Sequence, residues 1–539
     1  ASTTFERTDY FFIVPKENLK PALELFSEMI FRPLLEPGAM KAEVQAVKQE
    51  LLRDLVNPSF DLYMASLALH AKTPRMAKPM IGTIKEMDEQ SGKLPRNFFE
   101  RWYSPSNMTM VVQGNTTELE GIVEFTHKIF EKFKKFQIPP RASFKGELKT
   151  PEHALAYKIK AEPGNRRLLN VAFPLEYNIQ NWAAATVLAD YLNREDSALD
   201  DLRKIGFIES AQIAVETYQD VLYFRMLMSL TELGEQNIEA VHTMGTMAFG
   251  SIQKNGLPQH LIDESKASLL GANLGIDTAD LITEGLARPN TDLYFRHKAV
   301  ESIGTKDLKW LATQMPPERA QVTLRTPNAS GRIHPAVGRP VEQIDFAPLM
   351  PELKQAYASA NIVIESGENP YLAEEGPGVL LEEREVKTTS GIKKRPTMQV
   401  LVVPQTGSEE AAVLLEFRFP RAVKTPEELV AVELAVEAFE NERENRIFFD
   451  HIQRAGISLD FRMDKSSMRM ILNLSGPYKN AAKALEEFIV RWRTFEITPD
   501  LLESAKSSLA STIRANPVSE VSRQAVSAGI KALTGGKFI

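Results

Sequence analysis

Two glutamates stand seven residues apart in a segment with helical periodicity. Glu43 and Glu50 both lie in the segment EVQAVKQEL. Seven residues make about two helical turns, so both carboxylates point to the same side. They flank an apolar stripe that consists of Met40, Val44, Val47 and Leu51. A carboxylate in that position is partly withdrawn from water, which suits a metal ligand or a residue that supports one. The alternative is that each glutamate is solvated and pairs with Lys48 or Arg53.

The histidines do not complete a metal site by themselves. The eight are His70, His127, His153, His242, His260, His297, His334 and His451. No two stand three, four or five residues apart, so no helical histidine pair can bind zinc from within this chain. Cysteine is absent, which excludes disulfides and thiolate chemistry. Neither a G-x-S-x-G nucleophile motif nor a glycine-rich phosphate loop is present.

Two aromatic residues follow the glutamates. Phe60 and Tyr63 share one face of a helix that resumes after Pro58. Core packing is the ordinary interpretation of such a pair, and a pocket for a substrate side chain is the alternative.

A strand, helix, helix pattern that occurs three times must position these residues. The copies span Tyr10 to Leu52, Tyr223 to Leu270 and Met468 to Leu509. Each has an apolar strand, a turn, an amphipathic helix, a break ending in proline and a second helix. Copies this long and this far apart indicate tandem α+β domains with antiparallel-rich sheets and helices on one face, not a solenoid of short repeats.

Further elements accompany the repeats. Strands are predicted at Thr109 to Val112, Arg166 to Leu175 and Val413 to Pro420. The segment Ser197 to Phe207 predicts a helix with a serine N-cap and with Gly206 just past its end. In the third copy Gly456 has the matching position.

The length of 539 residues predicts three or four domains. We expect a first domain at 1–148, a second at 149–330, a connector rich in Pro, Gly and charge at 331–397, and part of a third at 398–539. The apolar segment ANIVIES favours partial order in the connector.

Composition excludes several function classes. The chain is 43% apolar and 25% charged, with a net charge of −7 and both signs mixed, so nothing favours a nucleic acid or an anionic membrane as partner. No run approaches the roughly 18 apolar residues of a membrane helix.

Several motifs, in order along the chain, resemble the pitrilysin/insulin-degrading-enzyme (insulinase) family of inverted-zincin zinc metallopeptidases. In the first domain they are TTFERTDYFFIV, EVQAVKQEL and WYSPSNMTMVVQGN. The second domain contributes LDDLRKIGF, the connector NPYL, and the third domain EFRFPRAV and FEITPDLLESAKSSL. Any one of these is a weak signal, but together they are specific and cover nearly the whole chain.

The resemblance assigns roles to the residues above. In this family two histidines of an H-x-x-E-H motif and a downstream glutamate bind one Zn²⁺, and the glutamate of the motif is the general base. Glu50 matches the downstream zinc ligand, and Glu43 matches a supporting carboxylate. Phe60 and Tyr63 match aromatic positions beside the cleft. Ala1 matches the end of the edge strand to which peptide substrates add by β-augmentation.

The departures from the family pattern concern what lies outside the chain. The H-x-x-E-H segment is expected before Ala1, and the end of the third domain and a fourth domain after Ile539. We therefore expect an internal piece of a longer protein, with the missing N-terminal segment and C-terminal domain as its partners. NREDSALDD stands where the family usually has a glycine-rich turn.

Two functions follow from the resemblance. The first is a zinc metalloendopeptidase that degrades peptides enclosed in a chamber, with this chain inactive on its own because it lacks the histidines and the base. The alternative is a non-catalytic paralogue that binds peptides or acts as a scaffold. Bacterial relatives of the pitrilysin type are often periplasmic, which suggests that location.

Overall fold

The computed structural model divides the chain into two compact units. It describes residues 1–4, 7–71, 77–78, 81–88, 93–112, 121–139, 155–161, 167–218, 221–272, 294–335, 337–345, 347–362, 410–418, 426–464 and 469–515. The first unit comprises residues 1–193 and 197–364, and the second comprises residues 194–196 and 365–539.

A seven-stranded sheet is the centre of the first unit. Its strands are β3 (Leu155–Lys160), β4 (Arg167–Glu176), β5 (Ile208–Tyr218), β6 (Val221–Leu230), β7 (Gln321–Thr326), β8 (Arg332–Ile333) and β9 (Pro340–Asp345). They lie in the order β5-β6-β4-β7-β3-β9-β8, and every neighbouring pair is antiparallel except β3 with β7. The strand predicted at Arg166 to Leu175 is β4, and the strand of the second repeat is β6.

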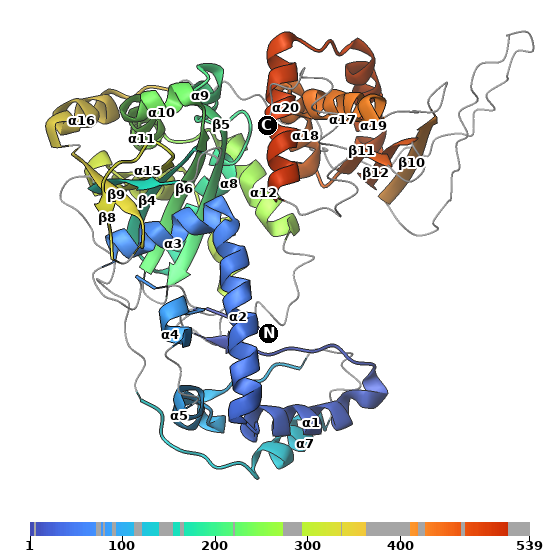
Figure 1. Cartoon of the computed structure of the whole chain (residues 1–539). Helices are drawn as coiled ribbons and strands as arrows, with labels where there is room; N and C mark the ends of the chain where they lie inside the picture. Colours follow the sequence, from blue (N-terminus) through green and yellow to red (C-terminus); the bar gives the residue numbers. More distant parts are fainter. Residues whose placement is uncertain are drawn as a thin grey trace, which may run out of the picture. The chain divides into compact units, whose positions relative to one another are not determined.

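Helices cover both faces of this sheet (Figure 1). On β4, Leu169, Val171 and Phe173 face one core, whereas Leu168 and Ala172 face the other. The larger core is completed by α8 (Ile179–Leu192), α11 (Ile238–Asn255), α12 (Gln259–Ala272), α14 (Tyr294–Ser302), α15 (Thr305–Thr313) and α16 (Met350–Ser359). The opposite face receives α3 (Pro58–His70). Because both faces are buried there, the adjacent strands β4 and β6 are apolar almost without interruption.

The polypeptide before the sheet is mostly helical. It contains β1 (Ser2–Thr3), β2 (Thr8–Asp9), η1 (Lys16–Asn18), α1 (Leu19–Phe31), α2 (Pro37–Val56), α3, α4 (Ile84–Asp88), α5 (Lys93–Trp102), η2 (Pro105–Asn107) and α7 (Ile122–Phe130). The predicted pair of helices around the Pro33 break is confirmed as α1 and α2. The strands predicted from Tyr10 and from Thr109 are wrong, since both segments lack regular structure. An apolar run becomes a strand only beside a partner strand, and no described strand pairs with either run.

One predicted helix is shorter than expected. Helix α9 (Asp200–Lys204) begins three residues after Ser197, so the predicted serine N-cap is wrong. The Ser197 hydroxyl instead donates to the carbonyl of Leu192 at 3.0 Å. Gly206 follows the helix with φ +81°, as predicted for a residue that ends a helix in the left-handed region. The short α10 (Glu232–Gln236) precedes α11.

The second unit repeats the strand, helix, helix order. Its sheet has the order β10-β12-β11, from β10 (Glu410–Arg418), β11 (Ser458–Asp464) and β12 (Arg469–Pro477). Its helices are α17 (Pro426–Asn441), α18 (Arg443–Arg454), α19 (Tyr478–Thr494) and α20 (Pro499–Ala515). Aromatic rings around Phe439 fill its core. The α+β architecture predicted from the repeats is therefore confirmed.

Part of the expected connector folds with the first unit. β8, β9 and α16 lie within residues 331–362, and β9 pairs with β3. The remainder of the connector, 363–397, lies outside the described residues. Among the helices that the structure describes, none combines the length and apolar character of a membrane span.

Candidate functional site

Helix α2 presents both predicted carboxylates to solvent. Pro37 is its first residue, a position where a missing N–H costs nothing. Leu51 is buried and Val47 half-buried, whereas Glu43 and Glu50 are exposed. The sequence predicted carboxylates partly withdrawn from water. Instead they are exposed, because among described elements only α3 and α4 pack against α2 to any extent.

Lys48 and Arg53, the two cations with which the sequence allowed the glutamates to pair, have other partners. Lys48 pairs with Asp88 at 2.5 Å, and Arg53 lies 3.5 Å from Asp54. Neither Glu43 nor Glu50 makes a hydrogen bond or an ion pair with another residue that the structure describes. Pairing with Lys48 or Arg53, which the sequence left open, is therefore not observed, and both carboxylates are exposed.

A single residue connects α2 to α3. Asn57 ends α2 and also caps α3, where its side-chain oxygen accepts from the backbone N–H groups of Ser59 (2.9 Å) and Phe60 (3.3 Å). Pro58 opens α3 with its fixed φ. The two helices leave this elbow in different directions (Figure 1). The position of α3 on the sheet therefore determines where α2 points.

A buried polar seam holds α3 on the sheet. Ser66 accepts from the Asn170 amide at 3.0 Å and from the Thr323 hydroxyl at 3.1 Å. His70 lies 3.2 Å from the same hydroxyl, and its ring meets Tyr157 edge to face at 5.3 Å. Leu62, Ala65 and Leu69 fill the space between these contacts. Hydrogen bonds between buried polar groups of this kind favour one register for the helix.

The first turn of α3 carries a buried acid. Asp61 Oδ2 accepts from Arg325 Nε at 2.7 Å and from Arg339 Nη1 at 2.8 Å, and Arg339 Nη2 also donates to Oδ1. Arg325 lies on β7, and Arg339 lies directly before β9. Sequence analysis did not single out Asp61, although an acid two residues before Tyr63 on an otherwise apolar helix was a visible signal.

The two predicted aromatic residues differ in environment. Phe60 is half-buried in the first turn of α3. The guanidinium of Arg225 lies over the aromatic ring of Tyr63, 4.7 Å from its centroid. Tyr218 donates to Glu216 Oε2 at 2.5 Å, so the Tyr63 hydroxyl donates to Tyr218. Burial, followed by the charge of Glu216, raises the pKa of Tyr63 far above its ordinary value and keeps this hydroxyl protonated.

Ala1 lies at the start of a short antiparallel ribbon. It is exposed and immediately precedes β1, where Ser2 pairs with Asp9 and Thr3 with Thr8. Arg7 closes the ribbon through an ion pair with Asp9 at 2.9 Å.

The described residues supply part of a zinc site at most. No group of three or more His, Cys, Asp or Glu side chains able to hold a metal occurs among them. Glu50 suits one oxygen ligand, since it is charged, solvent-accessible and on a regular helix. A tetrahedral zinc ion needs further ligands, and these would come from outside the described residues.

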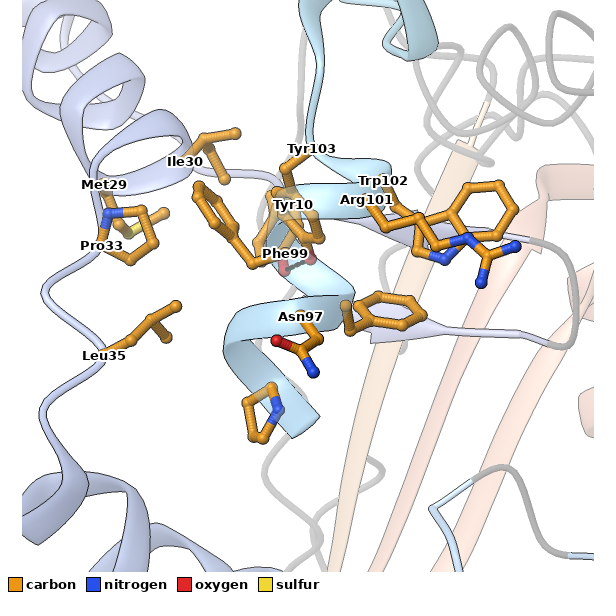
Figure 2. Close-up of a pocket in the computed structure, with 12 residues that line it drawn as sticks. Tyr10, Met29, Ile30, Pro33, Leu35, Asn97, Phe99, Arg101, Trp102 and Tyr103 are labelled. Atoms are coloured by element: carbon orange, nitrogen blue, oxygen red, sulfur yellow. Dashed lines mark hydrogen bonds between the residues drawn. The ribbon is translucent and has the colours of Figure 1, made fainter. Parts of the chain in front are cut away.

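A cavity that sequence analysis missed lies between α1 and α5. Its volume is about 750 Å³, and aromatic rings of Tyr10, Phe99 and Trp102 contribute to its wall (Figure 2). Met29 and Leu35 line it from α1 and the loop after it. The aromatic run NFFERWY was the signal in the sequence.

Comparison with known proteins identifies the family. The model for "Insulinase (Peptidase family M16)" matches residues 1–75, and that for "Peptidase M16 inactive domain" matches residues 96–269. The protein "Insulin-degrading enzyme-like 1, peroxisomal" of Arabidopsis thaliana is 24% identical over 285 residues, which are 50% of this chain and 29% of that protein. "Protease 3" of Escherichia coli O157:H7 is 22% identical over 94% of this chain and 54% of its own length.

Solved structures agree with this assignment. The crystal structure of pitrilysin superposes with a TM-score of 0.58 and 17% identity, over 93% of this chain and 55% of that one. Across these three relatives the matched part is between about a third and about half of their length. The two family models and the named relatives point to one family: over residues 1–75 and 96–269 the chain matches the pitrilysin/insulinase family of peptidases.

Proposed function

We propose that this chain is part of a zinc-dependent metalloendopeptidase that degrades peptides enclosed in a chamber. Glu50 is the zinc ligand contributed by this chain, and Glu43 is the supporting carboxylate two turns earlier on α2. Ala1 ends the edge strand to which a peptide adds as a further strand. Phe60 and Tyr63 are the aromatic residues beside the cleft.

The observation that carries the proposal is the pair of exposed carboxylates on α2. Lys48 and Arg53 pair with Asp88 and Asp54 instead, so a cation from elsewhere would meet two carboxylates on one helical face that are not paired with either of them. When bound, zinc would act as a Lewis acid toward the peptide carbonyl. This chain's own part would be to hold one ligand position, orient the peptide strand and exclude water around it.

The remaining ligands and the general base would lie in a segment ahead of Ala1, and the rest of the second half of the chamber would comprise the end of the third domain and a fourth domain after Ile539. The test compares the 539-residue chain with the same chain extended upstream, each with one equivalent of zinc and a quenched fluorescent peptide. We expect cleavage only by the extended protein. Appreciable, chelator-sensitive hydrolysis by the 539-residue chain alone would contradict this division of the site.

The alternative is a non-catalytic paralogue that binds peptides or acts as a scaffold. The description of the model that matches residues 96–269 as an inactive domain gives it a specific basis. It predicts that the extended chain binds peptide without cleaving it. A periplasmic location belongs to the same set of proposals, and cell fractionation tests it.

A further inference from the structure

The elbow between α2 and α3 is the point at which the proposed ligand is connected to the sheet. Glu50 lies seven residues before Asn57, or about 10 Å along α2 at 1.5 Å per residue. A rotation of α2 by about 10° at the elbow would therefore move Glu50 by about 2 Å. Metal–ligand distances tolerate only about 0.2 Å, so the site requires the elbow to be held firmly.

Asp61 is positioned to hold the elbow between α2 and α3 from one side. Its side chain is only 10% exposed, and it accepts from two guanidinium groups that lie 264 and 278 residues away in the sequence. The side chain of Arg325 is 5% exposed. Buried charges are tolerated only with well-aligned partners, and planar guanidinium groups impose direction on the carboxylate. The first turn of α3 is thus tied to β7 and to the residue before β9.

Tyr63 holds the same turn from the other side. It contacts Tyr218 at the end of β5 and packs under Arg225 of β6, which itself pairs with Glu216 at 2.8 Å. Since β5 and β6 lie at one end of the sheet order and β9 near the other, the start of α3 is attached across the width of the sheet. One helix turn with two anchors on opposite sides cannot rock freely.

We propose that Asp61, with Arg325 and Arg339, is a positioning residue that fixes the direction of α2 and thereby the place at which Glu50 is presented. The role of Glu50 as a zinc ligand rests on the proposed function, but the effect of Asp61 on the direction of α2 does not. Asp61 acts through the helix and is not itself a ligand or a catalytic group.

Spin labels can measure this effect directly, because the chain has no cysteine and two introduced cysteines are therefore labelled uniquely. Gln49→Cys on α2 and Gln212→Cys on β5 occupy exposed positions. Electron–electron double resonance on the full chain then gives the distance distribution between helix and sheet. In Asp61→Asn we expect the mean to shift by about 2 Å or more, or the distribution to widen comparably, as a rotation of about 10° would require. Asp61→Glu is expected to restore part of the original width.

Two further variants keep the test decisive. Glu235→Gln disrupts another ion pair of the same unit, which joins α10 to Arg167 of β4 at 2.5 Å, and should leave the distribution unchanged. Arg339→Gln removes the more exposed partner while Arg325 stays, so it serves as the test if Asp61→Asn does not fold. An unchanged distribution in the folded Asp61→Asn, or in Arg339→Gln should that variant be needed, would overturn the proposal. The measurement involves neither zinc nor peptide, so its failure would leave the proposed function standing, and the converse also holds.

Discussion

Three acids in this chain illustrate how environment rather than residue type decides a role. Glu50 is exposed and unneutralised by described residues, which suits it to bind a cation. Asp61 is buried between two arginines, which suits it to hold a helix. Glu440 of α17 is half-buried, and burial, followed by the charges of Glu437 and Asp460, raises its pKa to about 7. Of these three acids, spacing in the sequence singled out only Glu50 as a candidate ligand.

Glu440 therefore predicts a pH dependence for the second unit. The folded protein holds its proton up to about pH 7, whereas an unfolded glutamate releases it near 4.5. Stability contributed by the neutral carboxyl is present below pH 4.5 and is lost as the pH rises towards 7. Glu440→Gln should match wild type at pH 4 and exceed it at pH 8. The difference between a pKa of 4.5 and one of about 7 sets an upper limit of about 3 kcal/mol on the gain in unfolding free energy. Screening by solvent reduces the expected gain to about 1 kcal/mol.

Hydrogen exchange of α17 and β11 in the full chain measures this difference locally. Glu496→Gln, at an exposed position of the same unit, is the control and should show no such trend. If Glu440→Gln changed protection equally at pH 4 and pH 8, the environment described for this carboxyl would be wrong.

At the scale of elements, the helices were predictable and the short strands were not. α1, α2, α11, α12, α19 and α20 follow from apolar periodicity and from proline at their breaks. The segment from Tyr10 is equally apolar, yet it forms no strand because pairing depends on a neighbour that periodicity cannot supply. For the same reason the polar seam beneath α3 was unpredictable, since its partners Asn170 and Thr323 lie on strands far away in the sequence.

The packing of α11 against α16 gives a prediction at this scale. A Cβ on Gly250 would lie 2.1 Å from the carbonyl oxygen of Tyr357, whereas one on Gly245 of the same helix would lie an ordinary 3.8 Å from Met226. Gly250→Ala must push α16 away and should cost about 1–3 kcal/mol in the free energy of unfolding. Gly245→Ala should be neutral or stabilising by up to about 1 kcal/mol. Urea unfolding of both variants tests this, and equal midpoints would contradict the close helix contact.

At the scale of the whole molecule, the family and its tandem α+β domains were predictable from motifs that occur in order along the chain. β8, β9 and α16 belong to the sheet and helices of the first unit, although composition had placed these segments in a connector. Proline, glycine and charge describe a segment's local preferences, but they do not reveal that β3 offers a free side with which β9 can pair. The matched part covers about half of the length of "Protease 3", and under the proposed function this chain contributes one zinc ligand, Glu50, to a longer protein.

Zinc content tests that contribution most directly. The upstream-extended protein is purified with Glu50 intact, with Glu50→Gln and with Gln49→Ala as the neighbouring control, and bound zinc is measured by mass spectrometry after dialysis. We expect about one zinc per chain for wild type and for Gln49→Ala, and a loss of at least about tenfold in affinity for Glu50→Gln, since removing a ligand weakens a zinc site at least as much as removing the group behind it. Full zinc occupancy and unchanged affinity in Glu50→Gln would contradict the central claim that this carboxylate is a metal ligand.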